Sequence, residues 1–374
     1  MDMPEKQAAG GQQGVQSAVK VIDCDVHPYV KDGIKSVFPY MPEAWQQRFT
    51  RKRAVVGAEA RSLKYLHPNG AVNREDARPP CGGVSGSDPH YLVQDLLVKN
   101  RIEHAVLNCL QTGALCSTLA GTDESIVLCS AFNDYLIDQW LPVDKRLKFA
   151  MSVPSQDPQA SAAEIRRIGK HSQIVAVSLP LLNILMGNRY WWPIYEAAQE
   201  MELPILVHVT GPDSIFYGPP MSAGGIPDSY VERYVTLTQG GESSVNSLVF
   251  SGVFEKFPKL KVIFVEYGFL WLLPLLWRMD RTWRQLRHEV PWVKKSPVEY
   301  VHEHIRFSTQ PIDEPQNPKD LDKLIEIMGY DQLCFSTDYP HWDNDMPGQS
   351  LRGLPAAERQ KIFWDNALTT FRMR

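Results

Sequence analysis

The sequence predicts a (β/α)8 barrel, an α/β fold in which eight parallel strands alternate with eight helices. Three observations predict it: eight short apolar segments recur along the chain, an amphipathic segment follows each of them, and several apolar segments are continuously rich in Val and Ile. Strands that are buried on both faces have that composition. The 374 residues suffice for one large barrel with insertions.

The predicted strands and helices alternate along the whole chain. The strands are expected at residues 21–26, 105–110, 147–153, 174–179, 204–209, 261–266, 304–309 and 332–337. The helices are expected at residues 89–101, 123–139, 157–170, 190–201, 242–256, 270–288, 317–328 and 355–371. Asp88-Pro89 and Asp157-Pro158 each combine an N-cap side chain with proline at the first helical position. A doubly wound sheet also alternates in this way, but it needs a glycine-rich phosphate loop, whereas the first strand ends in DVHP. The barrel is therefore the predicted fold.

The rest of the chain divides into one domain with two irregular insertions. Residues 1–19, rich in Gly, Gln and Ala, predict a disordered leader, and residues 20–374 predict a single barrel domain. Residues 28–88 after the first strand are long and rich in Pro, Gly and charge, which predicts an arm or lid over the barrel mouth. Residues 210–240 after the fifth strand predict an irregular segment that shapes the same mouth.

Composition excludes several classes of partner. The net charge is only −4 and no basic stripe is present, so we expect no nucleic acid partner. No apolar stretch is long enough to span a bilayer, and the first twenty residues lack a signal-peptide core, so we expect no membrane partner and a cytoplasmic location. The six cysteines form no CxxC pair and are expected as free, mostly buried thiols.

Polar residues at the ends of three strands predict a metal site. Asp25 and His27 end the first strand, His208 ends the fifth, and Asp338 follows the eighth. The C-terminal ends of barrel strands converge on one rim, and residues two apart on a strand point to the same side. A single histidine there is as well explained by a structural hydrogen bond, but two imidazoles and two carboxylates together form a ligand set for a divalent ion. We expect one zinc ion, with manganese, iron or cobalt as alternatives.

Three other polar residues near these strands have mainly structural interpretations. Asp23 lies one pleat behind Asp25 and is either a brace for a metal ligand or a buried, hydrogen-bonded carboxylate. His302 and His304 are expected at the start of the seventh strand, which faces the barrel bottom. We expect this pair to serve stability.

Four separated motifs carry a family resemblance: DCDVH, NRYWWPIYEAAQEMELPILVHVTG, FVEYGFLWLLPLLWRMD and FSTDYPHWD. Together they resemble the amidohydrolase superfamily, in the amidohydrolase-related branch that includes aminocarboxymuconate-semialdehyde decarboxylase and the hydroxybenzoate-type decarboxylases. The resemblance implies a barrel with one catalytic divalent metal, held here by Asp25, His27, His208 and Asp338. It also implies a homodimer, which the tryptophan-rich helix at 270–288 would favour.

The sequence departs from those decarboxylases at the end of the sixth strand. A histidine usually stands there in the branch, whereas this chain has Glu266. A carboxylate at that place would act as a base, hold a substrate amine or brace the site. A second bound metal is an alternative if the side chain of Glu266 or His341 points into the metal site.

The predicted function is a metal-dependent hydrolase that cleaves a C–N, C–O or C–S bond in a small organic substrate. The metal would lower the pKa of a bound water, Asp338 would act as general base, and Glu266 or His341 would assist. Tyr339 and Trp342, beside Asp338, are the expected substrate contacts. One alternative is a non-oxidative decarboxylase for an aromatic or unsaturated carboxylic acid, in which Asp338 protonates the ring carbon. The other is a barrel that only binds a ligand or scaffolds a complex.

Overall fold

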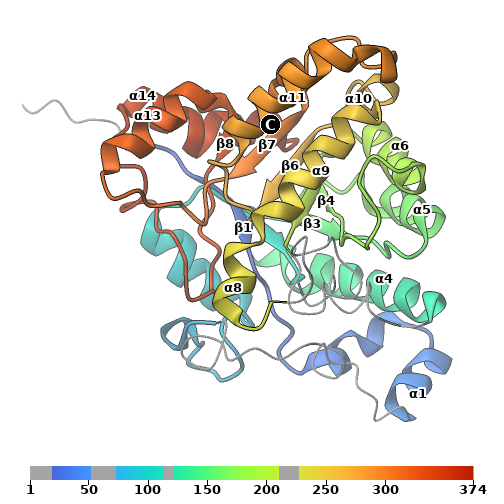
Figure 1. Ribbon diagram of the computed structural model, residues 1–374. Coiled ribbons are helices and arrows are strands. Elements are labelled where there is room, and N and C mark those ends of the chain that lie inside the picture. The colour runs from blue at the N-terminus through green and yellow to red at the C-terminus, as the bar shows by residue number, and fades with distance from the viewer. Residues whose placement is uncertain are drawn as a thin grey trace, which may run out of the picture.

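Eight parallel strands form a barrel surrounded by helices, which confirms the predicted fold (Figure 1). The computed structural model describes residues 19–51, 73–110, 112, 119, 121–209 and 227–373. Neighbouring strands pair in the order of the chain. The strands are β1 (Ile22–Val26), β2 (His104–Asn108), β3 (Leu147–Ser152), β4 (Ile174–Ser178), β5 (Ile205–His208), β6 (Val262–Val265), β7 (Ile305–Ser308) and β8 (Leu333–Cys334). Each predicted strand range overlaps one of them.

The barrel closes where β1 meets β8 and the segment that follows β8. The backbone N–H of Cys24 donates to the carbonyl of Phe335 at 2.9 Å, and the N–H of Asp338 donates to the carbonyl of Asp25 at 3.1 Å. These bonds join the segment after the last strand to the first strand and close the barrel. This closure places Asp25 and Asp338 side by side, although 313 positions separate them in the sequence.

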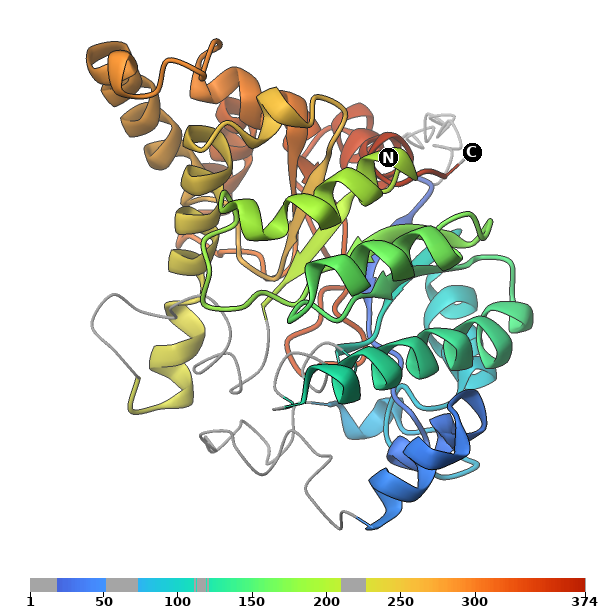
Figure 2. The ribbon, with the colours of Figure 1, turned by 90° about the vertical axis from the view of Figure 1, so that its right-hand side faces the viewer.

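The helices pack around the outside of the strands. They are α1 (Glu43–Arg51), α2 (Pro89–Leu92), α4 (Thr122–Gln139), α5 (Pro158–Ile168), α6 (Trp192–Glu200), α8 (Tyr230–Val235), α9 (Thr238–Phe250), α10 (Val253–Lys256), α11 (Leu272–Leu286), α12 (Pro297–His304), α13 (Pro318–Met328), α14 (Ala356–Gln360) and α15 (Asn366–Thr370). Figure 2 shows α4, α5 and α6 side by side along one flank. Helices α4 and α5 start close to the predicted boundaries, and Asp157 caps α5 by accepting from the N–H groups of Gln159 and Ala160, as its sequence predicts.

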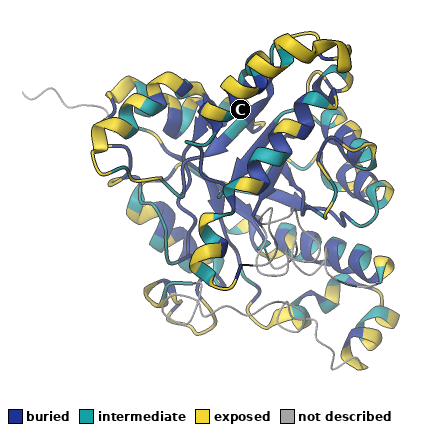
Figure 3. Cartoon of the chain, in the orientation of Figure 1, coloured by how far each residue is buried: buried dark blue, intermediate teal, exposed yellow. Residues whose placement is uncertain are grey.

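Two layers of apolar side chains stabilise the barrel. Figure 3 shows that the strands are buried and that the exposed residues lie on the surrounding helices and loops. The inner layer consists of small and branched residues that point into the barrel, among them Ile22, Cys24, Val106 and Leu206. The outer layer fills the space between strands and helices and contains most of the large aromatic side chains. Among the described cysteines, Cys81 is exposed and the others are buried, which agrees with the prediction of mostly buried thiols.

The prediction of irregular structure through residue 240 is wrong for its last part. Helix α8 and the start of α9 lie there. The Ser229 hydroxyl caps α8 by accepting from the N–H of Glu232. Gly241 lies inside α9, where a Cβ atom would come within 2.7 Å of the Trp271 ring. Glycine is needed there for close packing and not for a turn.

The prediction that His302 and His304 begin the seventh strand is also wrong. Both lie in the last turn of α12, a helix that was not predicted. Ser296 and Glu299 form a capping box at its N-terminus, followed by Pro297. The His304 Nδ1–H donates to the carbonyl of Leu260 at 2.8 Å, so a structural position at the barrel bottom is retained.

The predicted arm is described in two parts. In the first, α1 and the preceding 3-10 helix η1 (Gly33–Tyr40) pack against α4, where Tyr40 donates to Asp138 at 2.6 Å. In the second, Asn73 pairs with the backbone of His341 at the barrel mouth. The predicted leader, the centre of the arm at 52–72 and residues 210–226 lie outside the described ranges. No helix within the described ranges is long and apolar enough to cross a membrane.

Candidate metal centre

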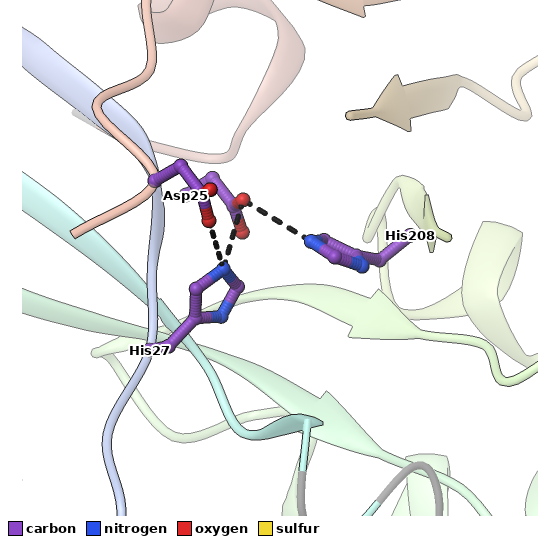
Figure 4. A group of neighbouring side chains, drawn as sticks. Asp25, His27 and His208 are labelled. Carbon is purple, nitrogen blue, oxygen red and sulfur yellow. Dashed lines mark hydrogen bonds and ion pairs between the residues drawn. The ribbon is translucent and has the colours of Figure 1, made fainter. Parts of the chain in front are cut away.

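Four predicted ligands meet at the C-terminal rim of the barrel. Asp25, His27, His208 and Asp338 are buried, and one ligand atom from each lies within 4.8 Å of the other three. His27 Nε2 lies 2.7 Å from Asp338 Oδ1 and 3.1 Å from Asp25 Oδ2, which in turn lies 3.3 Å from His208 Nε2. Figure 4 shows the two imidazole rings converging on Asp25 from different strands. The structure therefore brings all four predicted ligands together.

The donor atoms are arranged as a cation requires. Asp25 Oδ2 and His208 Nε2 are buried, and among the described residues they are contacted by the other ligand side chains and, for His208, by Glu266. The His27 Nδ1–H donates to the carbonyl of Asn108 at 2.9 Å, and the His208 Nδ1–H donates to the carbonyl of Val209. Each ring thus keeps its Nε2 lone pair directed at the centre. Two nitrogens and two carboxylates in this arrangement fit a divalent transition metal or zinc.

The electrostatics of the four side chains explain why a cation is favoured. Burial alone would lower the pKa of His208, but Asp25 and Glu266 raise the pKa to about 10. Burial likewise opposes ionisation of Asp25, but His27 and His208 hold its pKa well below the ordinary value. The buried carboxylates are therefore stabilised by positive charge. Without a metal, that charge comes from protons on the neighbouring imidazoles. A metal competes for the same nitrogen lone pairs, so its binding would release protons.

Residues behind the ligands fix their orientation. Asn108, at the end of β2, donates from Nδ2 to Asp25 Oδ1 at 3.3 Å and accepts from the Ser178 hydroxyl at 2.8 Å. Asp23 accepts from both the N–H and the hydroxyl of Thr337, at 2.9 and 2.5 Å, and burial raises the pKa of Asp23 to about 7. Asp23 thus ties β1 to the residue before Asp338. Sequence reasoning missed Asn108, because a single polar residue in an apolar strand has no recognisable pattern.

Two carboxylates at the rim are held by unusual backbone geometry. Asp338 has φ of 61° and Glu266 has φ of 65°, both in the left-handed region that non-glycine residues seldom occupy. Such conformations persist only where the surrounding structure enforces them, and they concentrate at functional sites. Here they turn both side chains toward the same space above the barrel, where Glu266 Oε2 lies 3.1 Å from His208 Nε2.

His341 lies next to Asp338 and links it to the arm. Its Nδ1 is 2.7 Å from Asp338 Oδ1, and its ring stacks on His27 with centroids 4.4 Å apart. Its Nε2 is 3.0 Å from the hydroxyl of Tyr29, which lies 3.1 Å from Asn73 Oδ1. Burial and the neighbouring His27 lower the pKa of His341 to about 3. Tyr29 and Asn73 were not predicted, because they come from separate parts of the arm.

A second acidic group lines the other side of Asp338. Glu266, Asp338 and Asp343 also offer ligand atoms within 4.8 Å of one another. Tyr234 donates its hydroxyl to Asp343 Oδ2, and Gln310 donates from Nε2 to Asp338 Oδ2 and Asp343 Oδ2, both at 3.2 Å. Burial, with Asp338 and Glu266 nearby, raises the pKa of Asp343 to about 7.

The two predicted substrate contacts differ in position. Trp342 lies at the mouth, with its ring 6.0 Å from that of Tyr234. Tyr339 is buried in the outer apolar layer, and its hydroxyl donates to Asp95 on the helix before β2 at 3.1 Å. The structure therefore brings Trp342, but not Tyr339, to the site.

Comparison with known proteins identifies the family. Residues 114–373, more than half of the chain, match the amidohydrolase family. The chain belongs to this family. The amidohydrolase is 25% identical over 304 residues to the gamma-resorcylate decarboxylase of Polaromonas sp. (strain JS666), which covers 75% of this chain and 88% of that relative. It is also 25% identical over 307 residues to the gamma-resorcylate decarboxylase of Rhodococcus jostii (strain RHA1). That alignment again covers 75% of this chain and 88% of the relative.

Solved structures share the fold over nearly the whole chain. An amidohydrolase from Mycobacterium avium subsp. paratuberculosis superposes with a TM-score of 0.70 at 20% identity, covering 94% of this chain and 98% of that one. A dihydroxybenzoic acid decarboxylase from Polaromonas sp. JS666 was solved with bound manganese and 2-nitroresorcinol. It superposes with a TM-score of 0.63 at 19% identity, covering 95% of this chain and 97% of that one.

The relatives contradict the prediction of a hydrolase. Curated proteins that align with this amidohydrolase are decarboxylases, which was the alternative. The prediction failed because the same two imidazoles and two carboxylates serve either reaction, so the ligands do not determine which bond breaks. The sixth strand does not end in histidine, but His341 places another imidazole 2.7 Å from Asp338.

Proposed function

We propose that the protein is a metal-dependent, non-oxidative decarboxylase that releases CO2 from a small aromatic or unsaturated carboxylic acid. The observation that carries the proposal is the alignment with gamma-resorcylate decarboxylases over 88% of their length. The four converging ligands support it, because this reaction needs a cation to hold the substrate carboxylate.

The reaction replaces a carboxylate by a proton. The bond between the ring carbon and the carboxylate breaks, its electron pair stays on the ring carbon, and that carbon gains one proton. A divalent metal, when bound, would supply the positive charge that positions the carboxylate and a neighbouring hydroxyl. Asp338 delivers the proton in this proposal, because it belongs both to the four-ligand group and to the group with Glu266 and Asp343. Burial raises the pKa of Asp338 to about 6 in the metal-free chain, which favours a proton-carrying role.

His341 and Tyr29 are suited to return the proton to Asp338. The Nδ1 of His341 lies 2.7 Å from Asp338 Oδ1, and its Nε2 lies 3.0 Å from the Tyr29 hydroxyl. This chain of contacts leads from the carboxylate toward the arm. Trp342 and Tyr234 at the mouth offer ring faces to a planar substrate.

We infer that manganese and zinc are the metals to test first. The ligand set contains two nitrogens and two carboxylate oxygens, which both ions accept. Manganese is the ion named in the solved Polaromonas decarboxylase. Metal-free protein reconstituted with each ion would separate the two choices.

The experiment is a decarboxylation assay on reconstituted protein. Manganese- and zinc-loaded samples are incubated with 2,6-dihydroxybenzoate and other hydroxybenzoates, and released CO2 and the decarboxylated product are quantified. Turnover is expected with at least one acid, and Asp338→Asn should lower kcat by about 10²- to 10⁴-fold, the usual contribution of a positioned acid. Asp345→Asn is the matched control, since Asp345 is outside both ligand groups. Absence of CO2 from every acid, with metal bound and the fold intact, would disprove the proposal.

A further inference from the structure

A cavity of about 720 Å³ lies on the outer flank of the barrel, and none of the four metal ligands lines it. Its wall is formed by the start of α6, the turn between α9 and α10, and the segment at 290–296 before α12. Figure 1 shows α6 and α10 beside each other on this flank, away from α8. We propose that this flank cavity binds a small planar anion, whose ring lies on Trp292 and whose acid group is held by Arg189 and Lys256. The inference does not depend on the proposed reaction.

The charge of the flank cavity favours an anion. Three cationic side chains and one carboxylate line it, although the chain as a whole carries a net charge of −4. The carboxylate, Glu255, already pairs with Lys294 at 2.9 Å and accepts from the Tyr300 hydroxyl. Within the described ranges, Arg189 and Lys256 form no ion pair with a carboxylate. Two cations in one cavity can therefore bind the acid group of a ligand.

Trp292 offers a fixed aromatic surface in the same cavity. Its side chain is 49% exposed, although its indole N–H donates to the carbonyl of Phe250 at 2.8 Å. The ring also lies against Gly252, where φ is 74° and a Cβ atom would come within 2.6 Å of the indole. The ring is therefore held in place while half of it stays open to solvent. A planar ligand that stacks on it would remove this apolar surface from water.

The second tryptophan of the cavity orients Arg189. The guanidinium carbon of Arg189 lies 5.1 Å from the centroid of the Trp192 ring. Trp192 is fixed in turn by an edge-to-face contact with Phe257, with centroids 5.7 Å apart. Stacking on a ring positions a guanidinium without using its N–H donors. The planar fork of Arg189 is therefore available for two parallel hydrogen bonds to a carboxylate or a phosphate.

These features together indicate the class of ligand. An anion without a ring would use the two cations alone, and a neutral ring would use Trp292 alone. A planar anion uses both, so it should bind more tightly than either. Aromatic carboxylates and nucleotides share this chemistry. The volume of the cavity is typical of sites for small organic ligands.

The experiment locates binding by fluorine NMR of the full-length protein labelled with 5-fluorotryptophan. Trp292→Phe and Trp342→Phe assign the resonances that report the flank cavity and the barrel mouth. Salicylate and adenosine monophosphate are the planar anions, and benzamide and inorganic phosphate are the controls that lack the charge or the ring. At least one planar anion should shift the Trp292 resonance along a saturable curve, while the two controls at equal concentration should not. A response to salicylate alone would indicate an aromatic carboxylate, and a response to adenosine monophosphate alone would indicate a nucleotide.

Two variants test the cations directly. Arg189→Ala and Lys256→Ala should each raise the dissociation constant of the bound probe about tenfold. Lys259→Ala is the matched control, because Lys259 is an exposed lysine outside the cavity, and it should leave the constant unchanged. Arg189 and Lys256 are exposed as well, so their replacement should preserve the fold.

The outcomes separate this inference from the proposed function. A Trp292 resonance that no probe shifts would overturn the inference, and so would a dissociation constant that is unchanged in both Arg189→Ala and Lys256→Ala. An equal shift with benzamide or phosphate would overturn the planar anion as the ligand. A shift of the Trp342 resonance alone would place the probe at the mouth, which overturns the flank site and leaves the decarboxylase proposal intact. Failure of the decarboxylation assay would not affect the Trp292 result.

Discussion

Replacing Asn108 by alanine tests whether the residues behind the ligands set metal affinity. Asn108 is fully buried at the end of β2 and is not one of the four ligands, but its Nδ2 donates to Asp25 Oδ1 at 3.3 Å. The Ser178 hydroxyl donates to Oδ1 of the same amide at 2.8 Å. The His27 contact uses the backbone carbonyl of Asn108, so the substitution leaves that contact in place. The substitution removes the brace on Asp25 and the acceptor of the Ser178 hydroxyl, and of these two bonds only the first reaches a ligand.

The expected loss of affinity follows from that one hydrogen bond. A hydrogen bond to a charged group contributes about 1.5–3 kcal/mol. Since about 1.4 kcal/mol corresponds to tenfold in an equilibrium constant, the metal dissociation constant should rise by about 10- to 100-fold. This range agrees with the usual effect of removing a residue that orients a metal ligand.

Competition titration of metal-free protein against a chromophoric chelator measures the change. Asn133→Ala is the matched control, because Asn133 is an equally buried asparagine whose amide bonds Ser152 and Glu164 on the outside of the barrel. It should lower the free energy of unfolding and leave metal affinity unchanged. A dissociation constant within threefold of wild type for Asn108→Ala, with the fold intact, would refute the bracing role.

Three further predictions concern the proton path, the pH dependence of stability and the metal. Tyr29→Phe should lower kcat about tenfold, the value of one lost hydrogen bond, and should leave manganese stoichiometry unchanged; an unaltered kcat would remove Tyr29 from the proton path. Burial lowers the pKa of His304, so its contribution to stability is present above the ordinary histidine pKa of about 6.5 and is lost as the pH falls below it. The melting temperature of His304→Phe should therefore fall less than that of wild type between pH 7 and pH 5, and equal slopes would contradict the assignment. Chelation should lower the melting temperature, and manganese at about 100 times its dissociation constant should restore about 2.7 kcal/mol of stability; no change on chelation would argue against a bound metal.

The fold and the ligands could be predicted because each depends on a repeated local signal. Buried parallel strands are continuously apolar, and a polar residue at the C-terminal end of such a strand has to lie on the barrel rim. Asp25, His27 and His208 satisfy that rule directly. Asp338 follows β8 after three intervening residues, and the closure with β1 holds this segment in place. Helix α12 also has a readable signal, the capping box from Ser296 to Glu299, although it was not predicted.

The remainder of the site depends on contacts between distant segments, which leave no periodic trace. Tyr29 and Asn73 reach His341 from two parts of the arm, and no spacing in the sequence connects them. The left-handed backbone at Glu266 and Asp338 is imposed by the surrounding fold, since non-glycine residues seldom occupy that region. Tyr339 follows Asp338 directly, yet the turn at Asp338 sends its ring into the outer apolar layer. Adjacency in sequence was therefore a poor guide to adjacency at the mouth.

Asp338 is the residue shared by the four-ligand group and the group with Glu266 and Asp343. Its Oδ1 faces His27 and His341, while its Oδ2 faces Gln310 and, beyond it, Asp343. The first set of neighbours orients the carboxylate toward a cation, and the second sets the charge that an incoming substrate meets. The predicted hydrolase and the proposed decarboxylase would both use the first set, because each would work with a cation held by the same four ligands. The second set has no such constraint, so the difference between the two reactions should be sought around Gln310, Glu266 and Asp343.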